Sequence, residues 1–252
     1  MLPVSGTEVG RAAYSVGAGG DTTLEVDRLA EVVVFSELAT VVERGEKFSV
    51  LSEEAGLRNF GAEYPLILVD PVDGSLNAKQ GVPVFGLMLA LLDGPAVRDV
   101  RAGLVLNMAT GEEWTAIRHQ GARRAGKPLE ALARSHRKRI ELLGLESSPR
   151  SVKLADSLME RSSKIRILGS MALSIALTAA GGFDVFCAPI PRRVFDTAAS
   201  LLVLAETGGV ATDLGGRSLE GMPCDLKSTS TLLCASSREL HEEAMALLSS
   251  GR

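Results

Sequence analysis

The chain has 252 residues, 46% of them hydrophobic, which is enough apolar material for one large core or two closely packed halves. Its formal net charge of -4 excludes the basic field on which nucleic acids and anionic membranes usually depend, so neither partner is expected. The 3 cysteines have no CxxC spacing and the 3 histidines are scattered, so neither a disulfide framework nor a zinc site is predicted.

The beginning of the chain lacks the features of a signal peptide. Met1, Leu2 and Pro3 are followed by neither a basic region nor a long apolar stretch, and the apolar residues 84–92 are too few to span a bilayer. Together with the cysteine pattern, this predicts a soluble protein of the reducing cytoplasm.

The first predicted element is an amphipathic helix over about residues 24–42. Thr22 and Glu25 have the spacing of a capping box, and apolar residues recur after them at helical spacing. Glycine, proline and asparagine then separate five predicted strands, at residues 48–51, 66–69, 84–92, 103–106 and 113–117. A helix followed by a sheet is therefore expected in the first half.

A charged region follows the last of these strands. Residues 125–151 are interpreted as solvated surface structure that joins two subdomains, residues 1–125 (α+β) and 126–252 (α/β), within one catalytic unit. The charges of this region include Arg134, Arg137, Lys138 and Arg139.

Helices and a strand alternate beyond this junction. The small apolar residues of 170–180 predict a buried helix, and residues 184–188 predict a strand. Two more helices are predicted, one over residues 196–206 that ends at Gly208-Gly209 and one over residues 238–248 that begins at Ser237. The alternation predicts a layered α/β arrangement.

Two carboxylates follow the apolar residues 66–69. Asp70 and Asp73 are three positions apart, and Pro71 and Gly74 force the chain to turn after the strand. The spacing suits a hard metal ion, but a β-turn whose Asp side chains bond their own backbone explains it equally well. Other residues must decide between these interpretations.

Three further acidic features each have an ordinary explanation. An exposed loop accounts for Glu53 and Glu54, a helix dipole favours Asp27 in a first turn, and a helix N-cap accounts for Asp196. Their order and identity in one chain nevertheless favour a common acidic site.

In these residues the chain resembles the inositol monophosphatase superfamily, the magnesium-dependent phosphatases that include fructose-1,6-bisphosphatases. The resemblance covers nearly the whole chain and implies a five-layer αβαβα sandwich with its site between two subdomains. Residues 192–196 look most like archaeal members, several of which act on both inositol phosphates and fructose bisphosphate. The family signature consists here of Glu53-Glu54, residues 70–75, residues 196–199 and Gly208-Gly209.

The resemblance implies two or three Mg²⁺ ions, which suit oxygen ligands. One ion would be bound by Glu53, Asp70 and the Val72 carbonyl. A second would be bound by Asp70, Asp73 and Asp196, so that Asp70 bridges the pair.

The resemblance also implies that water is the nucleophile. Ser75, hydrogen-bonded to Asp27, would orient and deprotonate that water, so Asp27, Ser75 and Glu53 are the predicted catalytic residues. The backbone N–H groups of Gly74, Ser75 and Leu76 would bind phosphate at the start of a short helix. Residues 17–20 lack the pattern of a dinucleotide fingerprint, and we predict a mobile active-site loop there.

The sequence does not decide which alcohol is esterified in the phosphate substrate. Animal inositol monophosphatases have a substrate-binding Glu seven positions before the helix-start Asp, where this chain has Pro189. Arg192, Arg193 and Lys227 are candidates to bind a second phosphate, which favours fructose 1,6-bisphosphate while inositol 1-phosphate remains possible.

Two other functions are kept as alternatives. One is a phosphatase of the same superfamily that acts on NADP or on a nucleotide 3′-phosphate. The other is a regulator that binds metal and phosphoester without turnover. This alternative is kept because the chain has Phe195 in place of the usual Trp and Ser75 in place of the usual Thr. The resemblance further implies a homodimer or tetramer.

Overall fold

The computed structural model describes residues 4–129 and 140–250. Its helices are α1 (Glu8–Arg11), α2 (Glu25–Glu43), α3 (Ser75–Gln80), α4 (Asp156–Arg161), α5 (Met171–Ala179), α6 (Ala198–Glu206) and α7 (Arg238–Ser250), with 3-10 turns η2 (Val97–Asp99), η3 (Val152–Ala155) and η4 (Phe195–Thr197). Its strands are β1 (Ala13–Val16), β2 (Thr22–Leu24), β3 (Phe48–Ser52), β4 (Gly56–Asp73), β5 (Gly86–Leu92), β6 (Val100–Asn107), β7 (Glu113–Ile117), β8 (Gly121–Arg124), β9 (Lys127–Leu129), β10 (Leu142–Leu145), β11 (Lys164–Arg166), β12 (Val185–Arg193), β13 (Val210–Thr212) and β14 (Thr229–Ala235).

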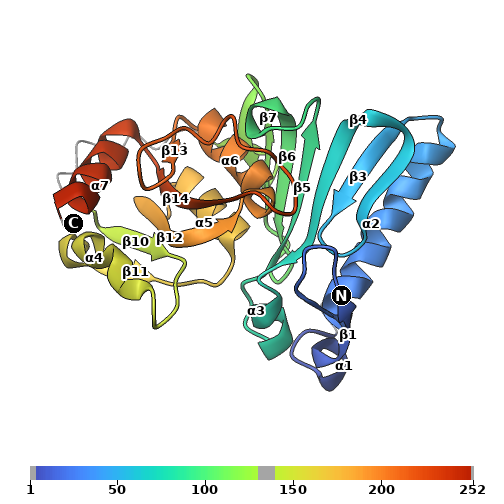
Figure 1. Cartoon of the computed structure of the whole chain (residues 1–252), viewed down its shortest axis with the longest axis horizontal. Coiled ribbons are helices and arrows are strands. Elements are labelled where there is room, and N and C mark those ends of the chain that lie inside the picture. The colour runs from blue at the N-terminus through green and yellow to red at the C-terminus, as the bar shows by residue number, and fades with distance from the viewer. Residues whose placement is uncertain (1–3, 130–139, 251–252) are drawn as a thin grey trace.

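Sheets and helical layers alternate across the molecule (Figure 1). A seven-stranded sheet has the order β3-β4-β5-β6-β7-β8-β9, and α2 covers its outer face. Helices α5 and α6 fill the space between this sheet and a five-stranded sheet of order β11-β10-β12-β14-β13. Helices α4 and α7 cover the far face of the second sheet. The predicted five-layer αβαβα sandwich is confirmed.

Alternating side chains explain why the inner strands are apolar on both faces. In β5, Met88 and Ala90 are buried in the core cluster of α5 and α6, whereas Leu89 packs with the α2 side chains. In β12, Phe186 enters the same inner cluster, and Cys187 points to the cluster of α4 and α7. Strands covered by helices on both faces need apolar residues at consecutive positions.

The predicted strands of the first half all form, several of them with longer bounds. The main difference is β4, which begins at Gly56 and contains residues 66–69 only in its second half. Strand β3 lies between the two halves of β4, because Ser49 is opposite both Asn59 and Leu66. The second half of β4 is thereby placed inside the sheet, with its end at the candidate site.

The predicted capping box at the start of α2 is wrong. Thr22 and Thr23 instead pair with β1 as part of β2, and the Thr23 hydroxyl bonds the Glu54 carboxylate. The N-cap is Leu24, whose N–H donates to Asp27 Oδ2 at 2.8 Å. Both threonines pair with β1 and cannot cap the helix. The side chain of Asp27, one turn into the helix, therefore accepts the hydrogen bond from the backbone at the helix start.

The predicted surface junction over residues 125–151 is also corrected. It contains β9 and the buried strand β10, in which Leu143 and Leu145 are 0% and 1% exposed. Strands of three or four residues carry too little periodicity to be recognised. Arg134, Arg137, Lys138 and Arg139 lie outside the described residues, and the subdomain boundary near residue 125 stays a prediction.

The predicted helices of the second half are confirmed, with one change at Asp196. Ser170 caps α5, and the Ser237 hydroxyl accepts from the Leu240 N–H at 3.3 Å at the start of α7. Gly208 follows α6 with a φ of 80°. The N-cap of α6 is Thr197, so the alternative role of Asp196 as that cap is wrong and its carboxylate is available to the site. Among the described residues, no helix is long and apolar enough to cross a membrane.

Candidate active site

The turn after β4 is held by a glycine that other residues cannot replace without strain. Gly74 has a φ of 90° and is the N-cap of α3. A Cβ at this position would lie 3.0 Å from the Gly169 carbonyl oxygen and 3.2 Å from that of Val84. The turn therefore brings the start of α3 against the segment that leads into α5.

Three acidic residues converge beside this turn. Glu53 follows β3, Asp70 lies near the end of β4, and Asp196 lies in η4 before α6. One carboxylate oxygen from each lies within 4.8 Å of the others. The structure thus brings together three of the four carboxylates that were predicted as metal ligands.

The electrostatics of this cluster disfavour carboxylates without a counter-ion. Burial and the charge of Glu53 raise the pKa of Asp70 well above its usual value, and the same two causes raise that of Asp196 to about 7. Asp196 Oδ1 is buried without a hydrogen-bond partner among the described residues. Clustered, partly unsatisfied oxygens are the donor set that suits a hard divalent cation, so these residues fit such an ion.

Asp27 and Ser75 lie next to each other as predicted. Burial is the main cause that raises the pKa of Asp27 to about 6, and the Leu24 N–H and the nearby Ser75 side chain oppose the rise. Asp27 Oδ1 is buried and has no hydrogen-bond partner among the residues that the structure describes. The Ser75 hydroxyl donates to the Val72 carbonyl at 3.0 Å, which links this pair to a predicted metal ligand.

Asp73 is directed elsewhere. Its Oδ1 accepts from the Met171 N–H at 3.1 Å, and its Oδ2 accepts from the Ala172 N–H at 2.8 Å and from the Ser170 hydroxyl. The carboxylate therefore binds the start of α5 and lies outside the cluster of three. Its predicted role as a ligand of the second ion stays a prediction.

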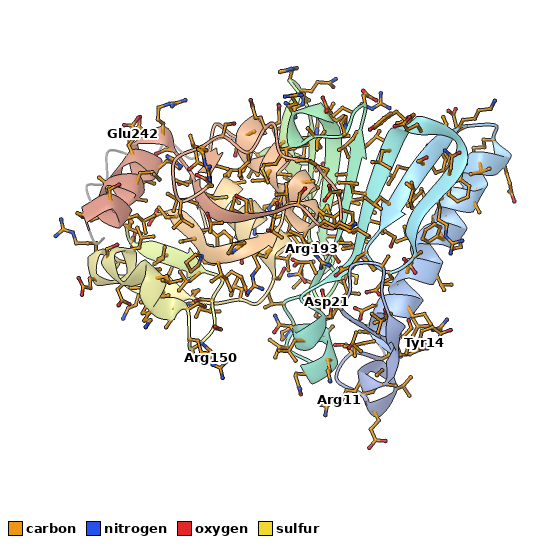
Figure 2. All side chains as sticks on the ribbon, viewed as in Figure 1. Arg11, Tyr14, Asp21, Arg150, Arg193 and Glu242 are labelled. Atoms are coloured by element: carbon orange, nitrogen blue, oxygen red, sulfur yellow. The ribbon has the colours of Figure 1, made fainter. Side chains whose placement is uncertain are left out.

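Arg193 lies inside the acidic cluster. Its Nε donates to Asp196 Oδ2 at 3.1 Å, and its Nη2 bonds Glu53. Its Nη1 lies 3.3 Å from Asp21 Oδ2, and Figure 2 shows these two side chains at the junction of the N-terminal segment with the two sheets. Residues 17–20 lie against the backbone of Glu53, since the Gly19 N–H donates to the Glu53 backbone carbonyl at 2.8 Å.

The other predicted substrate residues are arranged differently. Arg192 pairs with Glu146 at 3.3 Å and leaves 38% of its side chain exposed. Lys227 is exposed in a turn whose next residue, Ser228, accepts from the Val194 N–H at 3.0 Å. No contact joins the Lys227 side chain to the acidic cluster among the residues that the structure describes.

Two residues that support the site were missed in the sequence. Asn77 donates to the Val84 carbonyl at 2.7 Å and to the Leu168 carbonyl at 2.6 Å, so it fixes α3 against the segment before α5. Glu146 is the partner of Arg192. Burial is the main cause that raises the pKa of Asp73, hydrogen bonds from the start of α5 oppose the rise, and the charge of Glu146 adds to it. Their partners are distant in sequence, so no local signal indicated either role.

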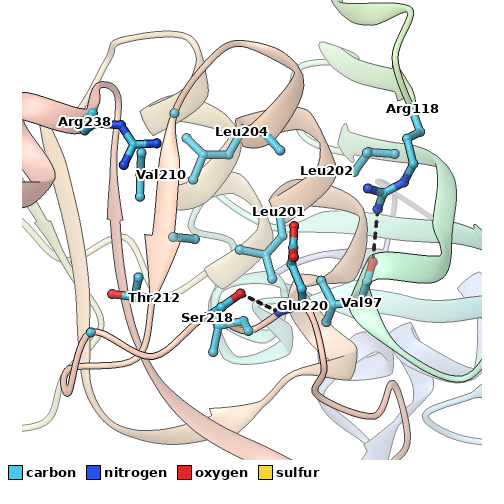
Figure 3. Close-up of a pocket in the computed structure, with 15 residues that line it drawn as sticks. Val97, Arg118, Leu201, Leu202, Leu204, Val210, Thr212, Ser218, Glu220 and Arg238 are labelled. Carbon is cyan, nitrogen blue, oxygen red and sulfur yellow. Dashed lines mark hydrogen bonds between the residues drawn. The ribbon is translucent and has the colours of Figure 1, made fainter.

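A cavity of about 410 Å³ lies away from the acids, between α6, β13 and the segment around Leu219 (Figure 3). Its floor is apolar, with Leu201, Leu204 and Val210. Among the described residues that line it, Glu220 is the single acid, so they offer no cluster of oxygen ligands. The candidate chemistry lies at Glu53, Asp70 and Asp196 instead.

Comparisons with known proteins cover nearly the whole chain. The model of the inositol monophosphatase family matches residues 7–251. A "Fructose-1,6-bisphosphatase/inositol-1-monophosphatase" of Methanothermobacter thermautotrophicus is 33% identical over 98% of this chain and 91% of the relative. A "Bifunctional NADP phosphatase/NAD kinase" of Methanococcus maripaludis is 27% identical over 98% of this chain, which spans 46% of that relative. A solved structure from Pyrococcus horikoshii, described as similar to inositol-1 monophosphatase, superposes with a TM-score of 0.79 at 23% identity, covering 98% of this chain and 91% of that one.

Proposed function

The chain belongs to the inositol monophosphatase family, and from this premise we propose that it is a magnesium-dependent phosphomonoesterase for a small sugar or polyol phosphate. The observation that carries the proposal is the convergence of Glu53, Asp70 and Asp196 within 4.8 Å, beside the first turn of α3. Acidic clusters next to a helix start offer ligands for cations and N–H donors for phosphate in one place.

Glu53, Asp70, Asp196 and the Val72 carbonyl would hold the Mg²⁺ ions, of which we propose two or three. Asp73 would join them if its carboxylate turned from α5. When bound, the ions would lower the pKa of a water molecule and neutralise charge on the phosphate oxygens.

The chain's own residues would orient the reactants. The N–H groups of Gly74, Ser75 and Leu76 would bind the phosphate oxygens, because the first N–H groups of a helix have no acceptor within the helix. The Asp27 carboxylate, buried beside Ser75, would accept a proton through the Ser75 hydroxyl as water attacks phosphorus. The attack would proceed in line with the leaving alcohol.

For the substrate we propose inositol 1-phosphate, fructose 1,6-bisphosphate or both. The similarity to the fructose-1,6-bisphosphatase/inositol-1-monophosphatase of Methanothermobacter thermautotrophicus supports this class. Arg192, Arg193 and Lys227 are the proposed cations for a second phosphate, although Arg192 is paired with Glu146 and Arg193 with Glu53. The similarity to an NADP phosphatase/NAD kinase favours NADP as the second candidate.

Parallel kinetics test the choice. Phosphate release with Mg²⁺ is measured on inositol 1-phosphate, fructose 1,6-bisphosphate, NADP and 3′-phosphoadenosine 5′-phosphate. We expect the highest kcat/KM on one of the two sugar or polyol esters. A higher value for NADP than for both would reject the preferred substrate class, and no release from a broad phosphoester panel would favour a metal-binding regulator without turnover.

We also propose that the protein works in the cytoplasm as a homodimer or tetramer. Family membership supports the assembly, and the buried, unpaired cysteines support a reducing compartment. Light scattering at working concentration is expected to give the mass of a dimer or tetramer. The mass of a single chain would reject the assembly.

A further inference from the structure

One cation belongs to the acidic cluster itself. The Arg193 guanidinium contacts two of the three clustered carboxylates, Asp196 and Glu53. The same group lies 3.3 Å from Asp21 Oδ2 and donates to the Gly19 carbonyl at 3.4 Å. A single side chain therefore joins the candidate metal ligands to the loop of residues 17–21.

The guanidinium also fills the space between loop and acids. A Cβ added at Gly19 would lie 2.3 Å from Arg193 Nη1, so the loop backbone packs directly on the charged group.

The position of Arg193 has an electrostatic cause. Burial opposes its charge, but Asp196 and Glu53 outweigh burial and raise the pKa of Arg193, which therefore stays cationic. The guanidinium binds Glu53 Oε1 and Asp196 Oδ2, one oxygen from each of two candidate ligands, and leaves Asp196 Oδ1 without a partner among the described residues. Two cations on the same carboxylates repel each other, so the ion and the guanidinium must compete.

We propose that Arg193 is a positioning residue that changes places with the divalent cation and thereby couples metal binding to release of the 17–21 loop. Without metal, it neutralises Glu53 and Asp196 and holds the loop on them. With metal, it leaves the two carboxylates and faces the opened site, where an anionic substrate group can meet it. The inference rests on the proposed function only in that the acidic cluster binds a divalent ion.

Calorimetric titration with Mg²⁺ and with Mn²⁺, in the absence of substrate, tests the competition. Because Arg193→Gln removes the competing cation, we expect it to bind metal about tenfold more tightly than the wild type, within the usual range of coupling between sites. Arg193→Lys keeps the positive charge but lacks the planar guanidinium that bridges both acids. Its affinity for metal should therefore lie between that of the wild type and that of Arg193→Gln. Equal or weaker metal binding by Arg193→Gln would overturn the proposal.

Arg217→Gln is the matched control. It makes the same change in net charge, but Arg217 pairs with Asp213 and is 84% exposed. Its effect on metal affinity should stay within about twofold, because distant surface charges are screened. If the wild type binds neither metal, the proposed metal site fails, a result distinct from failure of the exchange.

Hydrogen exchange of the loop amides tests the coupling. The Ala18 and Gly19 N–H groups donate to the Glu54 and Glu53 carbonyls at 3.0 and 2.8 Å. We expect Mg²⁺ to speed their exchange in the wild type, and Arg193→Gln to exchange fast with or without metal. An unchanged or slower rate in the metal-bound wild type would overturn the coupling.

A milder variant covers the case in which Arg193→Gln does not fold. Asp21 is 77% exposed, so Asp21→Asn loosens the loop and leaves the acidic cluster intact. It should speed loop exchange and keep metal affinity within about twofold of the wild type, since only a screened pair is lost. A gain in affinity as large as that of Arg193→Gln would contradict competition at Glu53 and Asp196.

Discussion

Asp73 and Asp196 were predicted as equivalent ligands, but their surroundings differ. Asp196 keeps a buried oxygen without a partner, whereas both oxygens of Asp73 accept hydrogen bonds from the start of α5. A sequence motif gives the type and spacing of its residues, but the contacts of each side chain in the fold determine its role. The two aspartates should therefore respond differently to the same substitution.

Asp196→Asn should lower phosphate release by more than about 100-fold, because a ligand is lost. It should leave the thermal transition nearly unchanged, because Asp196 does not cap α6 and the Asn amide oxygen can still accept from Arg193. Asp73→Asn should also lower the free energy of unfolding by about 1–3 kcal/mol, since its amide NH₂ would face N–H donors of α5. Kinetics and denaturant unfolding of both variants measure the difference. Equal stability of the two variants would contradict the role of Asp73 at α5.

At the scale of elements, the site is the meeting point of short segments from both sheets. The second half of β4 supplies Asp70 and the turn, and α3 is fixed by Asn77 to the segment that leads into α5. The predicted strands and helices of the core were right because apolar periodicity is local. Short strands such as β9 and β11 were missed, because three residues that pair with a distant partner carry no period of their own.

Asn77→Ala should weaken both stability and catalysis. Its two hydrogen bonds would be lost and the Val84 and Leu168 carbonyls left without their donor, which costs about 1–3 kcal/mol of unfolding free energy. The start of α3 would also lose its position relative to the acids, so kcat/KM should fall by about tenfold. Gln80→Ala, at the exposed end of the same helix, is the control and should change neither quantity. Full activity of Asn77→Ala would show that α3 is positioned by other contacts.

At the scale of the whole molecule, buried acids oppose folding in the absence of a cation. The pKa of Asp27 is raised to about 6 and that of Asp196 to about 7, in both cases chiefly by burial. Since these folded-state values lie above the unfolded value near 3.8, the metal-free fold loses stability as the pH rises through this window. A bound divalent ion would offset that loss, because it favours the ionised acids.

Saturating Mg²⁺ should therefore raise the melting temperature, and the rise should grow with pH. An ion at 100 times its Kd adds about 2.7 kcal/mol, which corresponds to a rise of roughly 5–10 °C for a chain of this size. At pH near 5.5 protons compete for the same carboxylates, so the rise should be smaller than at pH 8. Melting curves in EDTA and in Mg²⁺ at both values test this. A rise that does not depend on pH would place the ion elsewhere.

The sequence alone determined the layered α/β fold, the turn of residues 70–75 and the identity of the acids, because periodicity, turn chemistry and motif spacing act over a few residues. Only the tertiary structure decided that Glu53, Asp70 and Asp196 meet, that Asp73 binds α5, and that Arg193 lies among the acids. These contacts join segments that are far apart in the chain. They depend on the register of two sheets and on the close packing of the layers between them, which no local pattern encodes.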